Sequence, residues 1–390
     1  MTQDLVLGID FGSSSTIAGV LVGDRIELVP DGGDVVIPSV VYAPDRGALE
    51  IGRRAAAHQL TEPQKVLRSV KRVLGVGTDE EIARHYAGSV PYRVDLTGAR
   101  PLFKLRSGDM APEQVAAQII RRVRDLAEAR FGAPVTKAVM TMSAAAPAGY
   151  RDAVVRAAKI AGVQLVELIA EPIAGTLALD LHRHPGRRRV IVCDFGGGTF
   201  DVSAVVQEGL RFSPVAAFGD HYLGGDDLDD ALARAIAGGI YKQSRYDMHR
   251  DIVRWNELLL RCESAKRQLS SRPEAVVAMR GAYNQDGRAR DLSVTVDKAW
   301  LDSAWGALLF RARNVVTECL HRAGWQHHHV DLVGLIGGSS LVPMFQAAIA
   351  ADFGAERILR ADAPELAVAQ GATLLTARHR GMSSGPTLAA

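Results

Sequence analysis

The sequence of 390 residues contains little cysteine, with Cys193, Cys262 and Cys319 as its three residues of this type. They lie far apart, are odd in number and follow no metal-binding spacing, so they indicate no disulfide framework. Reduced thiols are typical of the cytosol, and the N-terminus lacks the basic and apolar segments of a secretory signal. We therefore expect a cytoplasmic protein.

The sequence also lacks a long hydrophobic run and an excess of one charge. Its longest uncharged stretch, residues 332–351, contains Gly337, Gly338 and Pro343, which favour a strand, a turn and a helix over a membrane span. The 46 Lys and Arg residues nearly balance the 44 Asp and Glu residues, so we expect neither nucleic acid nor a membrane as a partner. The basic cluster at residues 187–189 follows a turn-forming segment, and we interpret it as a solvated turn.

A repeated strand pattern predicts two related halves. An apolar strand at residues 5–9 ends at Asp10, and another at residues 190–193 ends at Asp194. Each aspartate is followed by Phe-Gly, by a polar or glycine-rich tip and then by a second strand. Because one hydrophobic core rarely grows to 390 residues, two such hairpins indicate two α/β lobes facing each other.

The later elements of the two halves match in order. Strands at residues 138–142 and 332–336 each lead towards a helix, and each half ends with a helix opened by Glu-Pro or Pro-Glu, at 171–172 and 364–365. We expect lobe I at residues 1–184, with its core at 1–36 and 111–184 and an inserted subdomain at 37–110. We expect lobe II at 185–380, with its core at 185–228 and 304–380 and an inserted subdomain at 229–303, and a flexible tail at 381–390.

The two hairpin tips predict a phosphate clamp. Glycine lets backbone N–H groups approach phosphate oxygens, and nearby hydroxyls add donors. One glycine-rich tip more often makes only a tight hairpin, but two copies after strand-terminal aspartates favour the clamp. The residues of the two tips are Gly12, Ser13, Ser14, Gly196, Gly197, Gly198 and Thr199.

Three acidic residues at element ends predict a magnesium site. Asp10, Glu171 and Asp194 could converge, and carboxylates can orient the waters that a phosphate-bound Mg²⁺ keeps. Each alone could be a cap or a surface charge, and only the repeat favours the joint interpretation.

Four polar residues share one face of a predicted helix. Glu263, Lys266, Arg267 and Ser270 have the spacing i, i+3, i+4 and i+7, so they could contact a base and a ribose. The alternative is a solvated face with a Glu–Arg pair.

These motifs resemble those of the heat-shock 70 kDa (DnaK-like) chaperone family. The resemblance rests on residues 7–12, 194–203, 223–227 and 262–270, and continues in 37–40, 71–75, 171–172 and 336–340. It implies an actin-like ATPase (ribonuclease-H-like) fold, in which two lobes with inserted subdomains surround a central nucleotide cleft. It also implies ATP or ADP and Mg²⁺ as cofactors, the metal being held through waters by Asp10, Glu171 and Asp194.

The resemblance assigns roles to further residues. It implies that Lys71, Glu171, Asp194 and Thr199 act in catalysis. The other nucleotide contacts that it implies are Gly225, Glu263, Lys266, Arg267, Ser270, Gly337, Gly338, Ser339, Leu341 and Glu365.

Three positions depart from the family pattern. Leu341 replaces an arginine that stacks on adenine, which implies weaker base binding; Ser143 replaces a proline implicated in interdomain signalling; and Glu365 replaces an aspartate. A Ser-Gly-Pro tail stands where the family has a linker and a peptide-binding domain, so we expect no peptide-binding domain in this chain.

The expected function is a slow ATP-hydrolysing nucleotide switch of a DnaK-like chaperone, with a co-chaperone or nucleotide-exchange factor as its partner. Two alternatives of the same fold superfamily stay open, a small-molecule kinase and an actin-like scaffold.

Overall fold

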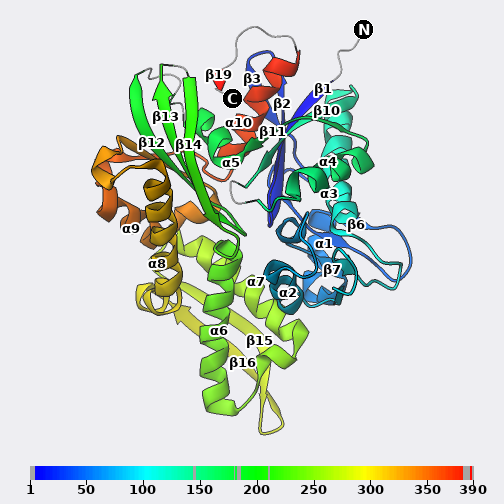
Figure 1. Ribbon diagram of the computed structural model, residues 1–390. Helices are drawn as coiled ribbons and strands as arrows, with labels where there is room; N and C mark the ends of the chain where they lie inside the picture. Colours follow the sequence, from blue (N-terminus) through cyan, green and yellow to red (C-terminus); the bar gives the residue numbers. More distant parts are fainter. Residues whose placement is uncertain are drawn as a thin grey trace.

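The chain forms two lobes, each built on one mixed β-sheet, with smaller extensions below them (Figure 1). This computed structural model describes residues 5–143, 146–179, 181, 186–209, 211–380 and 387–388. We call the lobe with the N-terminal sheet lobe I and the other lobe II. The predicted boundary between them, at residues 184 and 185, lies outside the described residues, so the division stays a prediction.

The sheet of lobe I has the strand order β11-β10-β1-β2-β3. β1, β10 and β11 run parallel, while β1, β2 and β3 form antiparallel pairs. The short strand β4 pairs with β2. The strands are β1 (Leu5–Phe11), β2 (Ser15–Val22), β3 (Arg25–Leu28), β4 (Ile37–Pro38), β10 (Val135–Met142) and β11 (Gln164–Ala170).

The sheet of lobe II repeats this arrangement in the order β18-β17-β12-β13-β14-β19. β12, β17 and β18 run parallel, and β12, β13 and β14 form antiparallel pairs. The shared order and directions confirm that the two halves are related. The strands are β12 (Arg187–Phe195), β13 (Phe200–Glu208), β14 (Arg211–Asp220), β17 (Leu332–Ile336), β18 (Ile358–Arg360) and β19 (Thr387–Leu388).

Two sequence interpretations change at this sheet. The turn predicted at residues 187–189 is wrong, because these arginines begin β12 and pair with Val206, Gln207 and Glu208 of β13. Apart from β19, which pairs with β14, the predicted tail at 381–390 lies outside the described residues.

Two helices lie between the sheets, α5 (Glu171–Ala178) and α10 (Ala367–Leu375) (Figure 1). They cross so closely that a Cβ at Gly371 would overlap the backbone carbonyl of Ala174. α10 begins later than the predicted start at residues 364–365. On the outer faces, α3 (Pro112–Phe131) and α4 (Tyr150–Ala161) pack in lobe I, and α8 (Lys298–Ala323) and α9 (Pro343–Phe353) in lobe II.

The first insertion forms small elements beside lobe I. They are β5 (Val41–Tyr42), β6 (Glu50–Ile51), β7 (Val66–Leu67), β8 (Val94–Asp95), β9 (Leu102–Phe103), α1 (Arg53–Ala57) and α2 (Glu81–Ser89). Three 3₁₀ helices join them, η1 (His58–Leu60), η2 (Pro63–Lys65) and η3 (Val70–Val73).

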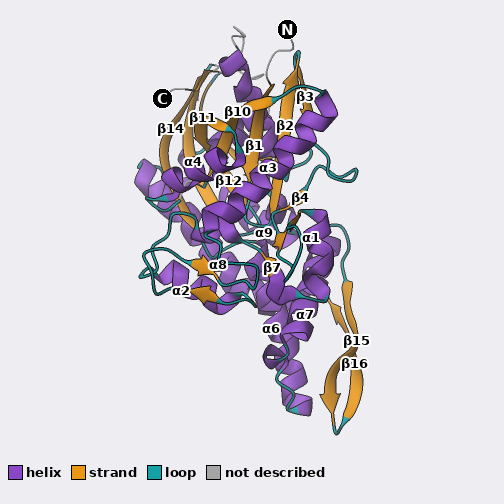
Figure 2. Cartoon of the chain, turned by 90° about the vertical axis from the view of Figure 1, so that its right-hand side faces the viewer, coloured by secondary structure: helices purple, strands orange, loops and turns teal. Residues whose placement is uncertain are grey.

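The second insertion extends lobe II with α6 (Gly225–Ser244), α7 (Ile252–Leu269), β15 (Ala275–Gln285) and β16 (Arg288–Val296). The hairpin of β15 and β16 projects from the lower end of the molecule (Figure 2). The predicted limits of this insertion, residues 229 and 303, fall inside α6 and α8, so both helices run from the core into the extension. Further 3₁₀ helices are η5 (Met248–Arg250), η6 (His327–His329), η7 (Gly338–Leu341), η8 (Ala355–Arg357) and η9 (Thr376–Arg380).

Separate hydrophobic clusters form the cores of the two lobes and the contact between their sheets. One fills lobe II, where the rings of Phe195, Phe200 and Phe345 pack at centroid distances of 4.8–5.4 Å. Another fills lobe I. A third, which includes Ile173 of α5 and Val368 of α10, joins the two sheets. The sheets therefore meet in a shared core, which leaves the inserted segments on either side of a cleft.

No helix of the described residues is long and apolar enough to cross a membrane. The three cysteines are buried and form no disulfide.

Candidate active site

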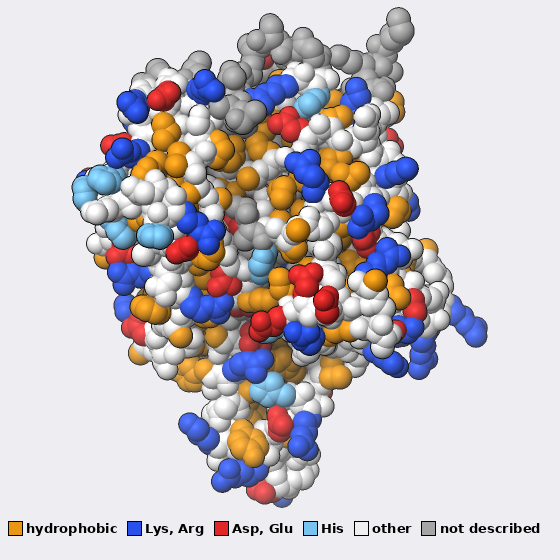
Figure 3. Space-filling view, in the orientation of Figure 1, with side chains coloured by type: hydrophobic (Ala, Val, Ile, Leu, Met, Phe, Trp, Pro, Cys, Tyr) orange, Lys and Arg blue, Asp and Glu red, His pale blue; other side chains and the backbone are white. Residues whose placement is uncertain are grey.

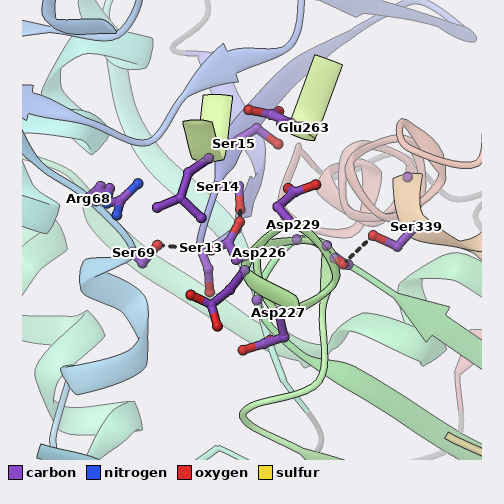
Figure 4. A pocket seen from close by; sticks show the side chains of 18 of the residues that line it. Ser13, Ser14, Ser15, Arg68, Ser69, Asp226, Asp227, Asp229, Glu263 and Ser339 are labelled. Carbon is purple, nitrogen blue, oxygen red and sulfur yellow. Dashed lines mark hydrogen bonds between the residues drawn. The ribbon is translucent and has the colours of Figure 1, made fainter. Parts of the chain in front are cut away.

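One cavity of about 1280 Å³ lies between the lobes and their insertions. All of the site residues predicted from the sequence line it, although they come from both halves of the chain. They are Asp10, Gly12, Ser13, Ser14, Lys71, Glu171, Asp194, Gly196, Gly197, Gly198, Thr199, Gly225, Glu263, Lys266, Arg267, Ser270, Gly337, Gly338, Ser339, Leu341 and Glu365. Part of this lining is seen from close by in Figure 4.

The two hairpin tips face each other in this cavity. Each is closed by the same backbone hydrogen bond at 3.0 Å, from Gly12 N–H to the Ser15 carbonyl and from Gly196 N–H to the Thr199 carbonyl. A Cβ at Gly197 would overlap the Ser14 side chain, and one at Gly198 would lie 2.6 Å from the Ser13 Cβ. The glycines therefore let the tips approach each other closely, and both tips line the cavity.

A buried lysine and three carboxyl groups lie near these tips. Asp10 and Asp194 stand at the ends of β1 and β12, and Glu171 begins α5. Lys71 in η3 donates a hydrogen bond to Glu171 within an ion pair whose two side chains are buried. The hydroxyl of Thr141 donates to Asp10 Oδ1 at 3.1 Å. Strand ends, a helix start and an insertion thus bring four charged groups together.

Burial makes this cluster unfavourable for negative charge. It raises the pKa of Glu171 to about 7, with a further rise from Asp10 and an opposing effect from Lys71. Burial and the charges of Glu171 and Asp10 also raise the pKa of Asp194 well above its usual value. For Lys71, burial opposes protonation, but the neighbouring Glu171, Tyr150 and Asp10 together raise the pKa. One ammonium does not neutralise three carboxylates, so an additional cation would stabilise their ionised forms.

The donor set suits a magnesium ion that keeps its waters. Carboxylate oxygens are the hard ligands that Mg²⁺ prefers, and the ion dehydrates reluctantly. Within the described residues, no three His, Cys, Asp or Glu side chains are close enough to hold a metal directly. Asp10, Glu171 and Asp194 supply such carboxylates, and their contact with the ion through waters stays a prediction.

Gly337, which follows β17, lines another wall of the cavity. Its φ is +81°, and a Cβ there would lie 2.6 Å from Asp194 Oδ1 and 2.5 Å from the Phe195 carbonyl oxygen. Only glycine combines this backbone conformation with so close an approach. The next turn, η7, carries Ser339, whose hydroxyl donates to the Gly196 carbonyl at 2.8 Å. This contact ties the second glycine segment to the second hairpin tip.

The polar face of α7 lines the cavity and also makes pairs of its own. Arg267 and Glu263 form an ion pair at 2.8 Å, as the alternative of a solvated face predicted. Lys266 bonds to the Gly225 carbonyl at 2.8 Å and to Asp229 at 2.6 Å. Burial raises the pKa of Asp229 to about 7 despite the opposing charge of Lys266. Lys266 thus fixes α7 against the start of α6.

Leu341 and Glu365 complete the wall near η7. The Leu341 side chain is 38% exposed, so an apolar group faces the open cavity. Glu365 lies beside Gly338, where an added Cβ would contact the Glu365 Cβ at 3.7 Å.

Sequence reasoning assigned no role to several residues that connect the lobes across the cavity. Asp226 of α6 accepts hydrogen bonds from Ser14 at 2.9 Å and from Ser69 at 3.0 Å (Figure 4). Arg72 pairs with Asp227 at 2.9 Å and donates to the Gly198 carbonyl at 3.1 Å. Arg72, Asp226 and Asp227 stand within the motifs at residues 71–75 and 223–227, and this position was their signal.

Comparison with known proteins agrees with this geometry. The family described as Hsp70 protein matches residues 6–387. A chaperone protein DnaK from Psychrobacter cryohalolentis is 31% identical over 376 residues, which cover 95% of this chain and 58% of that protein. The match confirms the predicted actin-like ATPase fold with its two α/β lobes. The chain belongs to the Hsp70 family and corresponds to the region of its nucleotide-binding domain.

Proposed function

We propose that this chain is the ATP-binding and ATP-hydrolysing switch domain of a DnaK-like chaperone. The observation that supports this most strongly is the convergence of Lys71, Glu171, Asp10 and Asp194 beside two facing hairpin tips. Such a site combines donors for phosphate oxygens with charged groups that can order water around a metal.

The hairpin tips would hold the phosphates of ATP from both sides. The backbone of residues 12–14 and 196–199 and the hydroxyls of Ser13, Ser14 and Thr199 supply the donors. When bound, Mg²⁺ would neutralise part of the phosphate charge, with Asp10, Glu171 and Asp194 holding its waters. The face of α7, together with Gly225, residues 337–341 and Glu365, would contact the adenosine.

Hydrolysis requires a water oxygen to bond to the γ-phosphorus. The bond between this phosphorus and the bridging oxygen breaks, its electron pair leaves with ADP, and the proton of the water passes to solvent. Lys71 would neutralise charge on the transferred phosphoryl group and help to place the water, while Glu171 holds the ammonium. Thr199, on the second hairpin tip, would assist hydrolysis by donating its hydroxyl to a phosphate oxygen.

Several observations support a switch rather than a permanently rigid enzyme. The lobes share one core at the sheets and meet again across the cavity, so nucleotide can be released if the cross-cavity contacts open. A nucleotide-exchange factor or co-chaperone would read this state. On the face shown in Figure 3, basic and acidic side chains are interspersed, which favours a protein partner over nucleic acid. The free, buried cysteines support a cytoplasmic location.

The test separates binding from hydrolysis. We expect Lys71→Ala and Asp194→Asn each to lower single-turnover ATP hydrolysis by roughly 100-fold or more, because their charges act where the transition state forms. Nucleotide affinity, measured by calorimetry, should change by less than about fivefold. Lys298→Ala, which removes an exposed lysine paired with Asp302, is the control and should hydrolyse normally. If both site variants hydrolyse ATP at the parental rate, the assignment of the site fails.

A further inference from the structure

Tyr150 is a buried residue at the start of α4 whose position depends on the segment that carries Lys71. Its side chain is 1% exposed and packs in the core of lobe I. A Cβ at the preceding Gly149 would overlap the Gly75 carbonyl, so the start of α4 lies directly against the loop after η3. Lys71 lies in η3. The tyrosine ring and the catalytic lysine are thus held by adjoining backbone segments.

The hydroxyl of Tyr150 is buried without a hydrogen-bond partner among the described residues. Other buried tyrosines of lobe I differ, since Tyr86 donates to the Arg68 carbonyl at 2.7 Å and Tyr92 accepts from the Arg68 N–H at 3.1 Å. An orphaned buried hydroxyl destabilises a folded protein, so its presence requires an explanation.

The surroundings of this hydroxyl are charged. Besides burial, the charged groups that influence the pKa of this hydroxyl are Lys71, Glu171, Asp10 and Asp201. A phenol hydroxyl without a partner is free to donate a hydrogen bond. A neutral donor beside these carboxyl groups is chemically suited to a carboxylate acceptor.

We propose that Tyr150 is a positioning residue for hydrolysis, whose hydroxyl donates a hydrogen bond to the Glu171 carboxylate in the nucleotide-bound protein. This inference rests on the proposed ATPase function. Glu171 already accepts from Lys71, and a second donor would restrict the carboxylate to one orientation. Lys71 would in turn keep the direction that it needs towards the γ-phosphate. Tyr150 itself touches neither the phosphate nor the attacking water.

The test is Tyr150→Phe, which removes only the hydroxyl. We expect single-turnover hydrolysis at saturating ATP to fall about tenfold, because a hydrogen bond to a charged group is lost where geometry controls the rate. The dissociation constant for ATP should stay within about twofold, since no phosphate or base contact changes. Thermal unfolding of the same variant reports whether the fold is intact.

Ser203→Ala is the matched control. The Ser203 hydroxyl on β13 is also buried without a partner among the described residues, and we assign it no role in the site. Its removal should leave hydrolysis unchanged and raise the unfolding temperature. If Tyr150→Phe behaves in the same way, its hydroxyl is only a structural orphan and the inference is overturned. If the parental protein itself does not hydrolyse ATP, the proposed function fails and the inference fails with it.

Discussion

Leu341 departs from the family pattern in the cleft, and its effect can be tested by measuring nucleotide affinity. The family pattern has an arginine here that stacks on adenine, whereas this chain presents a partly exposed leucine in the cavity wall. Leucine can pack against a base but lacks the planar cation. A guanidinium over an aromatic face contributes about 0.5–2 kcal/mol, depending on exposure.

We expect Leu341→Arg to tighten the binding of ATP and ADP by about two- to tenfold, equivalent to roughly 0.4–1.4 kcal/mol. Hydrolysis in a single turnover should be nearly unchanged, because a base bound beside Leu341 would lie away from the Lys71 cluster. Titration calorimetry and a hydrolysis assay on the same preparations measure both effects.

Leu341→Lys is the control for charge alone, since it adds a cation without a stacking plane. It should gain less affinity than the arginine variant. Equal or weaker nucleotide binding by Leu341→Arg, relative to the parental protein, would show that the base does not lie against this residue.

Site residues could be predicted where they stand in contiguous motifs. Asp10 and Asp194 were identifiable because each follows an apolar strand and precedes Phe-Gly. The contact between Ser14 and Asp226 across the cavity was not predictable, because the two residues are 212 positions apart and no local pattern connects them. The environment of Tyr150 also depends on tertiary structure, since a tyrosine at a helix start gives no local sign that its hydroxyl is buried.

The close packing of α5 against α10 depends on a glycine, which has no side chain. Gly371 lies in α10 where a methyl group would overlap the carbonyl group of Ala174. The obstacle is backbone of another helix, which cannot rotate away. The separation of the two central helices, and so of the two sheets, is therefore set at this crossing.

We expect Gly371→Ala to destabilise the protein by about 1–3 kcal/mol or more, because the added methyl group must push the helices apart. Urea unfolding without nucleotide measures this change. The variant should fold into the same two lobes but with a lower unfolding midpoint.

Gly238→Ala provides the opposite control. Gly238 lies inside α6, and a Cβ there would have no neighbour within 4 Å. Alanine should stabilise this helix by up to about 1 kcal/mol, since glycine is the weaker helix former. An unchanged or higher midpoint for Gly371→Ala would contradict the close crossing of α5 and α10.

The central strands of both sheets followed from local patterns, and the misread segment has a physical cause. Apolar runs marked both hairpins and their parallel partners at residues 138–142 and 332–336. The arginines at 187–189 were misread because their charge and the preceding turn signals favour a loop. Pairing with residues 206–208 of β13 extends them into a strand whose outer end tolerates charge. Pairing with β13, and not the local sequence, therefore determines the strand conformation of residues 187–189.

In the whole molecule, the lobes are joined at two levels. The shared core between the sheets is apolar, whereas the contacts across the cavity are polar and specific. Two further hydrogen bonds add to the contacts around Arg72 and Asp226. Tyr222 donates to the Ile82 carbonyl at 2.7 Å, and Asn256 donates to the Gln59 carbonyl. An apolar core between the sheets, combined with polar contacts across the cavity that we call the polar seam, is the arrangement of a hinge that can open.

Arg72 is the strongest candidate for holding that seam closed. Its side chain is 8% exposed, it pairs with Asp227, and its guanidinium lies 5.1 Å from the ring centre of Tyr222. All of these partners belong to the opposite lobe. Removing one member of a buried pair leaves the other uncompensated, and at interfaces this loss accelerates dissociation.

We therefore expect Arg72→Ala to speed the release of bound ADP by roughly tenfold or more, because the lobes would open more readily around the nucleotide. Stopped-flow release of a fluorescent ADP analogue measures this rate. Arg313→Ala is the matched control, since Arg313 pairs with Asp352 inside lobe II and does not cross the cavity. That variant should release ADP at the parental rate. If Arg72→Ala also does so, the polar seam does not limit opening, and the apolar core between the sheets must control nucleotide release.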